Sequence, residues 1–176
     1  MTARFSEGEG RASRVLRSKK TWVAATVGAA AIGVFATVAL GSPGSMFGIA
    51  GTETYVTANL DDSVQENSDR VKFQTKDPTD VRVQKIVFAA GGYSGWHHHP
   101  GIVIAAVASG TVTFTESDCS STTYGPGLPA GAVFVEKSDT PGQASSAGGA
   151  TVYATFIAPH ADPPVFRIED DPVTCP

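Results

Sequence analysis

Charged residues are scarce in this chain and unevenly distributed. Only 17% of the 176 residues are charged, and none occurs between Thr21 and Leu40. Residues 1–40 hold six basic and two acidic side chains, so the rest of the chain carries a net charge of −8, against −4 for the whole sequence. An acidic domain without a stripe of Lys and Arg is unsuited to a phosphate backbone, which excludes nucleic acid as a partner.

The uncharged run is long enough to cross a membrane. As a helix, residues 21–40 would span about 30 Å, which is the thickness of a bilayer core. The run follows a basic segment, residues 1–20, and this order is typical of export with the basic side kept in the cytoplasm. We expect a single-pass anchor in the cell membrane, with the remaining chain outside the cytoplasm. Secretion after cleavage is the alternative, although the run is longer than most cleavable signals.

Cysteine is nearly absent. Cys119 and Cys175 are the only two, and both follow the export segment. An even number of cysteines in an oxidising compartment favours one disulfide, which would join the C-terminus to the middle of the chain. A pair of thiolate metal ligands is the alternative, disfavoured because the two residues are far apart in the sequence and neither has a histidine beside it.

Long helical periods are absent after residue 70. Residues 41–70 are expected to form a linker and lead-in, and residues 71–176 a domain of short strands separated by Gly, Pro and Ser clusters. The apolar run 102–107 is typical of a strand buried on both faces, whereas 111–115 alternates. About eight short strands in one domain predict a sandwich or a closed barrel. The other strands are expected at 71–73, 81–89, 122–124, 132–136, 151–157 and 165–168.

Motifs for serine hydrolysis and for nucleotide binding are missing as well. Histidine is rare, but three of the 4 histidines are consecutive, His97 to His99. Alternate side chains of a strand point the same way, so His97 and His99 would share one face and could bind one metal ion. His98 would point to the opposite side. His160, near the C-terminus, is expected to face solvent.

The segment around these histidines, GGYSGWHHHPGIVIAAVASG, resembles the first motif of the cupin superfamily. That motif combines a glycine, a His-x-His pair, a glutamate and a final glycine, and the matching residues here are Gly91, His97, His99 and Gly110. The resemblance covers roughly residues 80–176. It implies an all-β, cupin-like jelly-roll barrel, preceded in this chain by the N-terminal helix. A homodimer is a further expectation, because cupin barrels often pair through a sheet edge.

Two ligand positions of the cupin pattern are occupied by other residues. Val103 stands where the glutamate is expected, and a valine cannot bind metal. Residues 131–136 resemble the opening of the second cupin motif, but the histidine expected within 141–145 is absent, and Gln143 is the nearest polar residue. The resemblance therefore implies a site built on the two histidines, with Gln143 as a further pocket residue.

Three functions are compatible with such a site. The favoured function is a binding module, either for a small ligand or for a divalent transition metal. Two protein ligands would hold such a metal weakly, which suits exchangeable binding better than catalysis. A metal-dependent oxygenase or isomerase is the second hypothesis, disfavoured because metal catalysis needs a fixed coordination shell. In the third hypothesis the barrel is a scaffold without an active site, since a fold does not determine a function.

Overall fold

The computed structural model describes residues 46–175, so the predicted membrane helix and its basic flank lie outside the described residues. Every regular element in 46–175 is a strand, which confirms the all-β prediction for this part of the chain. No helix among these residues is long and apolar enough to cross a membrane. The strands are β1 (Phe47–Leu60), β2 (Gln65–Asn67), β3 (Lys72–Gln74), β4 (Thr79–Tyr93), β5 (His97–His98), β6 (Ile102–Gly110), β7 (Val112–Glu116), β8 (Ser121–Tyr124), β9 (Val133–Glu136), β10 (Gly142–Ser146), β11 (Ala150–Pro159) and β12 (Ile168–Glu169).

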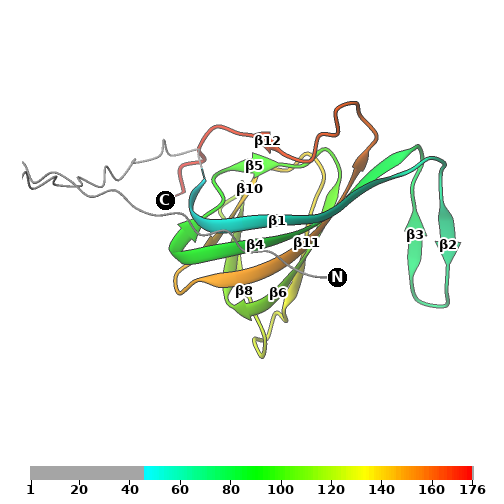
Figure 1. Ribbon diagram of the computed structural model, residues 1–176. Helices are drawn as coiled ribbons and strands as arrows, with labels where there is room; N and C mark the ends of the chain where they lie inside the picture. Colours follow the sequence, from blue (N-terminus) through cyan, green and yellow to red (C-terminus); the bar gives the residue numbers. More distant parts are fainter. Residues whose placement is uncertain (1–45, 176) are drawn as a thin grey trace, which may run out of the picture. The chain divides into compact units, whose positions relative to one another are not determined.

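The strands form a nearly closed antiparallel barrel with two walls (Figure 1). One wall has the order β1-β4-β11-β6-β9. The other has the order β12-β5-β10-β7-β8. Strand β4 belongs to both, because Gly92 and Tyr93 at its end pair with β10. This arrangement is consistent with the predicted jelly roll.

Side chains of the first wall alternate between the barrel interior and its surface. In β6, Val103, Ala105 and Val107 are buried, whereas Ile102 and Ile104 are each 40% exposed. The expectation that this strand is buried on both faces is therefore wrong. An antiparallel barrel wall packs one face on the core, so an uninterrupted apolar run also places apolar side chains on the outside.

Strand β1 lies within the segment assigned to the linker. It pairs with β4 from Phe47, opposite Tyr93, to Leu60, opposite Thr79, and so forms the edge of the first wall. Most of its residues are exposed. It therefore lacks the apolar alternation that identifies a half-buried strand in a sequence. Strands β2 and β3 follow it as a separate hairpin.

Residues 160–175 form a C-terminal strap that lies beside the histidine segment. Its strand β12 pairs with β5, with Ile168 opposite His98 and Glu169 opposite His97. The predicted disulfide between Cys119 and Cys175 is present, with a Cα–Cα distance of 5.5 Å. Because Cys119 lies in the turn between β7 and β8, the bridge ties the end of the strap to the second wall.

Candidate metal centre

Glycines on both sides of the histidine segment allow the backbone turns that place it in the second wall. Gly95 adopts a positive φ of 72°, a conformation that residues with a Cβ rarely take. A Cβ at Gly101 would lie 2.0 Å from the carbonyl oxygen of Ile157, so only glycine fits against β11 there. Between these points His97 lies in β5, and His99 follows it with a bridge to Ser138.

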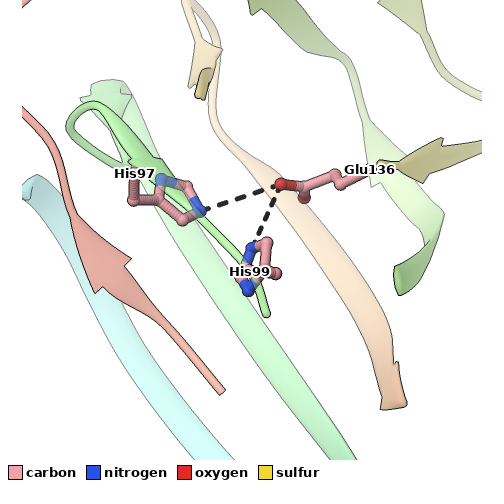
Figure 2. Close-up of side chains that lie close together, drawn as sticks. All are labelled: His97, His99 and Glu136. Carbon is pink, nitrogen blue, oxygen red and sulfur yellow. Dashed lines mark ion pairs between the residues drawn. The ribbon is translucent and has the colours of Figure 1, made fainter. Parts of the chain in front are cut away.

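His97, His99 and Glu136 converge inside the barrel (Figure 2). Glu136 Oε2 lies 3.2 Å from His99 Nε2 and 3.7 Å from His97 Nε2. The ligand atoms of the three residues all lie within 4.8 Å of one another. The side chains are 5% exposed for each histidine and 12% for the glutamate. Together the three residues form a group that could hold one metal ion.

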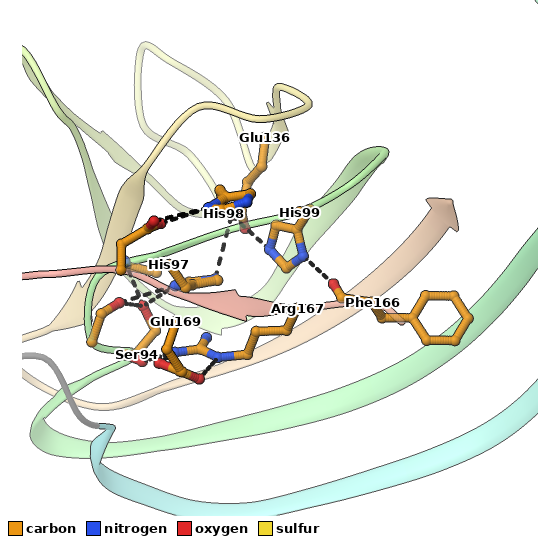
Figure 3. Close-up of polar contacts among 11 residues, drawn as sticks. Ser94, His97, His98, His99, Glu136, Phe166, Arg167 and Glu169 are labelled. Carbon is orange, nitrogen blue, oxygen red and sulfur yellow. Dashed lines mark hydrogen bonds and ion pairs between the residues drawn. The ribbon is translucent and has the colours of Figure 1, made fainter. Parts of the chain in front are cut away.

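The backbone fixes which nitrogen of each histidine is available. His97 Nδ1 donates to the Gly95 carbonyl at 2.9 Å, and His99 Nδ1 donates to the carbonyl of Phe166 in the strap (Figure 3). A carbonyl can only accept, so each Nδ1 carries a proton. In the neutral imidazoles both Nε2 atoms are then unprotonated, with their lone pairs available to a metal.

The burial of His97 keeps its imidazole neutral. Burial lowers the pKa of His97 to about 4, and the positive charge of Arg167 acts in the same direction, against the opposing effect of Glu136. Arg167 itself is held by Glu169 Oε2 at 2.9 Å and by the Ser94 carbonyl at 2.6 Å (Figure 3). At neutral pH His97 is therefore a neutral ligand.

Glu136 is the functional residue that the sequence analysis did not assign. It lies on β9 directly opposite Val103 of β6, so its side chain enters the barrel beside the position that Val103 occupies. The alternation of side chains in the strand expected at 132–136 could have indicated that Glu136 points inward. Phe134 is buried and Glu136 is two residues further on, hence on the same inward face. A carboxylate on the core face of a strand is a candidate ligand.

The three residues belong to the lining of a cavity of about 250 Å³. Most of its exposed lining is apolar, with Val103, Ala154 and Phe156 among the contributing side chains. Such a mixture of an apolar lining with a few convergent polar groups is typical of small-molecule sites. A metal bound here would face a partly open cavity large enough for a small organic ligand.

The other sequence-predicted residues lie away from this group. His98 points to the strap, where its Nδ1 contacts Asp170 at 2.9 Å. The side chain of His160 is 49% exposed and pairs with Asp80. Gln143 lines a second, more open pocket together with Trp96, and is not part of the lining of the histidine cavity.

No family model and no curated protein matches this chain. Similar solved structures include a conserved protein of unknown function from Streptococcus pyogenes, with 18% identity and a TM-score of 0.41 over 57% of this chain and 78% of that one. A salicylate 1,2-dioxygenase from Pseudaminobacter salicylatoxidans has 17% identity and a TM-score of 0.37 over 43% of this chain and 20% of that one. An oxalate oxidase has 21% identity and a TM-score of 0.37 over 43% and 40%. At these values the likeness assigns no role to any residue here, and the site rests on its own geometry.

Proposed function

We propose that this chain is a cupin-type barrel that binds a divalent transition metal through His97, His99 and Glu136 and presents it to a small molecule in the barrel cavity. The proposal draws on the motif around the histidines, on the antiparallel barrel and on the geometry of the three side chains. It replaces the expected two-ligand site by a three-ligand one, which would hold a metal more firmly.

One observation carries the proposal. Two histidine Nε2 atoms and a carboxylate oxygen face one another at 3.2 and 3.7 Å in a largely buried site. Both Nδ1 atoms donate to backbone carbonyls, so in the neutral imidazoles both Nε2 atoms are electron-pair donors, as is the carboxylate oxygen. Their mutual repulsion is removed when a cation lies between them, and a divalent metal ion is the cation that three such ligands prefer.

The ligand types indicate which metals fit. Two imidazoles and a carboxylate suit zinc, iron, manganese, nickel or cobalt, and the absence of a thiolate from the group disfavours metals that require sulfur. Hydrogen bonds from both Nδ1 atoms orient the imidazoles, as is usual for histidine ligands. The residues present therefore fit a metal ion.

Metal titration of the purified full chain tests the proposal. Calorimetry with Zn²⁺, Mn²⁺, Ni²⁺ and Fe²⁺, together with elemental analysis of the protein as isolated, should show one ion per chain. The variant H97A/H99A should bind none, whereas His98→Ala should still bind one ion per chain, because His98 does not belong to the group of three ligands. Absence of binding by the wild type for every metal offered would refute the metal site.

A metal-dependent enzyme is the second candidate. Three protein ligands leave coordination positions open, as in catalytic metal sites, and here those positions face a cavity. When bound, the metal would supply Lewis-acid chemistry to a substrate in that cavity. Turnover of candidate substrates by the metal-loaded protein, abolished in Glu136→Gln, would favour the enzyme over a binding module.

We also propose that the barrel lies outside the cytoplasm, anchored by residues 21–40 or released from them. The support is the basic segment before an uncharged run, together with a disulfide, which persists in oxidising compartments. Two reporter enzymes fused after residue 176 test this location. The reporter that works only outside the cytoplasm should be active, and the one that works only in the cytoplasm should be inactive. The homodimer stays a prediction.

A further inference from the structure

The cavity contains a cationic side chain that the metal site does not use. Arg82 of β4 lines the same cavity as His97, His99 and Glu136. Its neighbours across the wall are Thr57 of β1 and Phe156 of β11. Since Phe156 is buried on the inner face, the Arg82 side chain also leaves the backbone on that face.

Arg82 and Glu136 lie at opposite ends of one row of side chains. Cross-strand pairing links Arg82 to Phe156, Phe156 to Val103 and Val103 to Glu136, across β4, β11, β6 and β9. Three strand spacings of about 4.8 Å separate the two backbones by about 14 Å. The buried Phe156 and Val103 fill the space along the wall between them, so the row has a positive end, an apolar middle and a metal-binding end.

The guanidinium of Arg82 is oriented, and part of it is without a partner. Its Nε donates to Thr57 Oγ1 at 3.2 Å, and its Cζ lies 4.1 Å from the centre of the Phe166 ring. Among residues 46–175 the structure gives this guanidinium no ion pair and no hydrogen bond other than the one from Nε, and that bond is exposed. Its two terminal nitrogens therefore remain available for a planar anion, which a guanidinium binds with two parallel hydrogen bonds.

The second arginine at the cavity differs in this respect. Arg167 is engaged by Glu169 and by the Ser94 carbonyl, so its charge is balanced within the protein. With a divalent metal on the histidines and Glu136, the unbalanced Arg82 leaves the cavity with an excess of positive charge. Such a cavity favours an anionic ligand.

We infer that the cavity binds a small organic carboxylate, whose carboxylate group pairs with Arg82 and whose apolar body lies along Phe156 toward the metal-binding end. Gln84, on the same strand and lining the same cavity, offers a neutral hydrogen-bonding group near the carboxylate end. A cavity of about 250 Å³ has room for a molecule of the size of benzoate but not for a peptide or a sugar chain. This inference rests on the proposed function, since it names the ligand class of the same site.

Paired probes test the inference on the metal-loaded full chain. Benzoate and pyruvate are compared with benzamide and pyruvamide, which have nearly the same shape but no charge, by calorimetry or ligand-observed NMR. At least one carboxylate should bind the wild type at least about tenfold tighter than its amide, as expected for a charge-assisted pair. Arg82→Gln should lose this preference and bind both members of the pair with the affinity of the amide.

Two controls separate the ligand from the metal. Lys85→Gln removes a positive charge from the same strand, but Lys85 pairs with Tyr153 on the outer face, so this variant should keep the preference. Arg82→Gln should also bind metal like the wild type. An unchanged carboxylate preference in Arg82→Gln, or no preference in the wild type, overturns the inference. The two proposals can fail separately. If the chain binds no metal but still prefers the carboxylate, and Arg82→Gln removes that preference, this inference is supported and the metal site is refuted.

Discussion

Val103 and Glu136 lie directly opposite each other on neighbouring strands, with both side chains directed into the barrel. Val103, which stands where the resemblance to the cupin motif leads one to expect a glutamate, is only 1% exposed. The carboxylate that reaches the two histidines comes from the adjacent strand in the same row. Neighbouring inward positions of a sheet lie about 5 Å apart, so a side chain as long as glutamate can serve the same metal from either strand.

The first prediction is that Glu136→Gln weakens metal binding but stabilises the metal-free protein. Metal affinity should fall at least about 100-fold, because even the loss of a residue that only supports a ligand costs 10–100-fold. Without metal, the variant should be more stable than the wild type by about 1 kcal/mol, since the amide can donate to an imidazole Nε2 where the carboxylate cannot. Urea unfolding with and without Zn²⁺ measures both effects. A variant that is less stable than the wild type in the absence of metal would contradict the described cluster of three electron-pair donors.

The second prediction moves the carboxylate from β9 to the opposite position on β6. The variant V103E/E136V should recover metal binding that Glu136→Val alone loses, because the two side chains enter the same space from opposite positions. Calorimetric titration of both variants is the measurement, with V103L/E136V as a control for the change in volume at residue 103. Equal metal affinities for V103E/E136V and V103L/E136V would show that the two positions are not interchangeable.

How far the sequence predicts this site depends on the range of the contacts. The relation between His97 and His99 is local, because the period of a strand places alternate residues on one face. The third ligand depends on the pairing of β9 with β6, which brings together residues far apart in the chain. Glu136 was therefore placed on a predicted strand but not assigned to the site. The register of two strands is set by packing across the whole wall, and no local pattern records it.

The missed strands have a similar explanation. Strand β1 is stabilised by its pairing with β4 and is mostly exposed, so its sequence has no apolar face to detect. Strand β10, with the sequence GQASS, is built from small and polar residues, although Gly142, Ala144 and Ser146 are buried. Side chains this small reflect the space that neighbouring side chains leave, which is a property of the folded barrel.

The third prediction concerns Gly142 of β10, a strand that contributes no side chain to the group of three metal ligands. Gly142 lies opposite His97, so a side chain at residue 142 would share the face of that histidine. A Cβ there would lie 2.5 Å from Cζ of Phe114, whose ring stacks on Phe134 at 5.3 Å. Gly142→Ala should therefore destabilise the protein by about 1–3 kcal/mol, the usual cost of overpacking.

A double-mutant cycle with Phe114→Leu measures this clash. The destabilisation by Gly142→Ala should be clearly smaller in the Phe114→Leu background, and urea unfolding of the four proteins gives the coupling. Gly142→His should not tighten metal binding while Phe114 keeps its place. Additive effects of the two substitutions would show that the ring does not occupy the space beside residue 142.

The fourth prediction is a pH dependence at the other end of β4. Asp80 is 3% exposed and accepts hydrogen bonds from His160 Nδ1 at 2.9 Å and from Asn59 Nδ2 at 3.0 Å. Burial acts to raise the pKa of Asp80, but these bonds and one from the Ala161 backbone lower it overall. The hydrogen bond and the charge of Asp80 raise the pKa of His160, and nearby Asp162 and Asp61 act in the same direction.

The two shifts define the pH window of the stabilisation. The contribution of His160 is complete below about pH 6.5, its unfolded pKa, and is lost as pH rises through the raised value. That of Asp80 is present above about pH 3.9 and is lost as pH falls through its lowered pKa. The wild type should therefore exceed His160→Gln in free energy of unfolding by more at pH 5.5 than at pH 9. A difference that is the same at both pH values would contradict the pairing of His160 with Asp80.

The fifth prediction links the disulfide to the metal site through the strap. The bridge from Cys119 to Cys175 closes a long loop, with a sequence separation of 56, so C119S/C175S should lose about 2–4 kcal/mol of stability. The strap also carries the Phe166 carbonyl that accepts the proton of His99 Nδ1 and the arginine beside His97. Freeing the end of the strap should therefore weaken metal binding by about tenfold, the lower range for losing a group that orients a ligand. Unchanged metal affinity in a clearly destabilised variant would mean that the pairing of β12 with β5 positions His99 without help from the covalent tie.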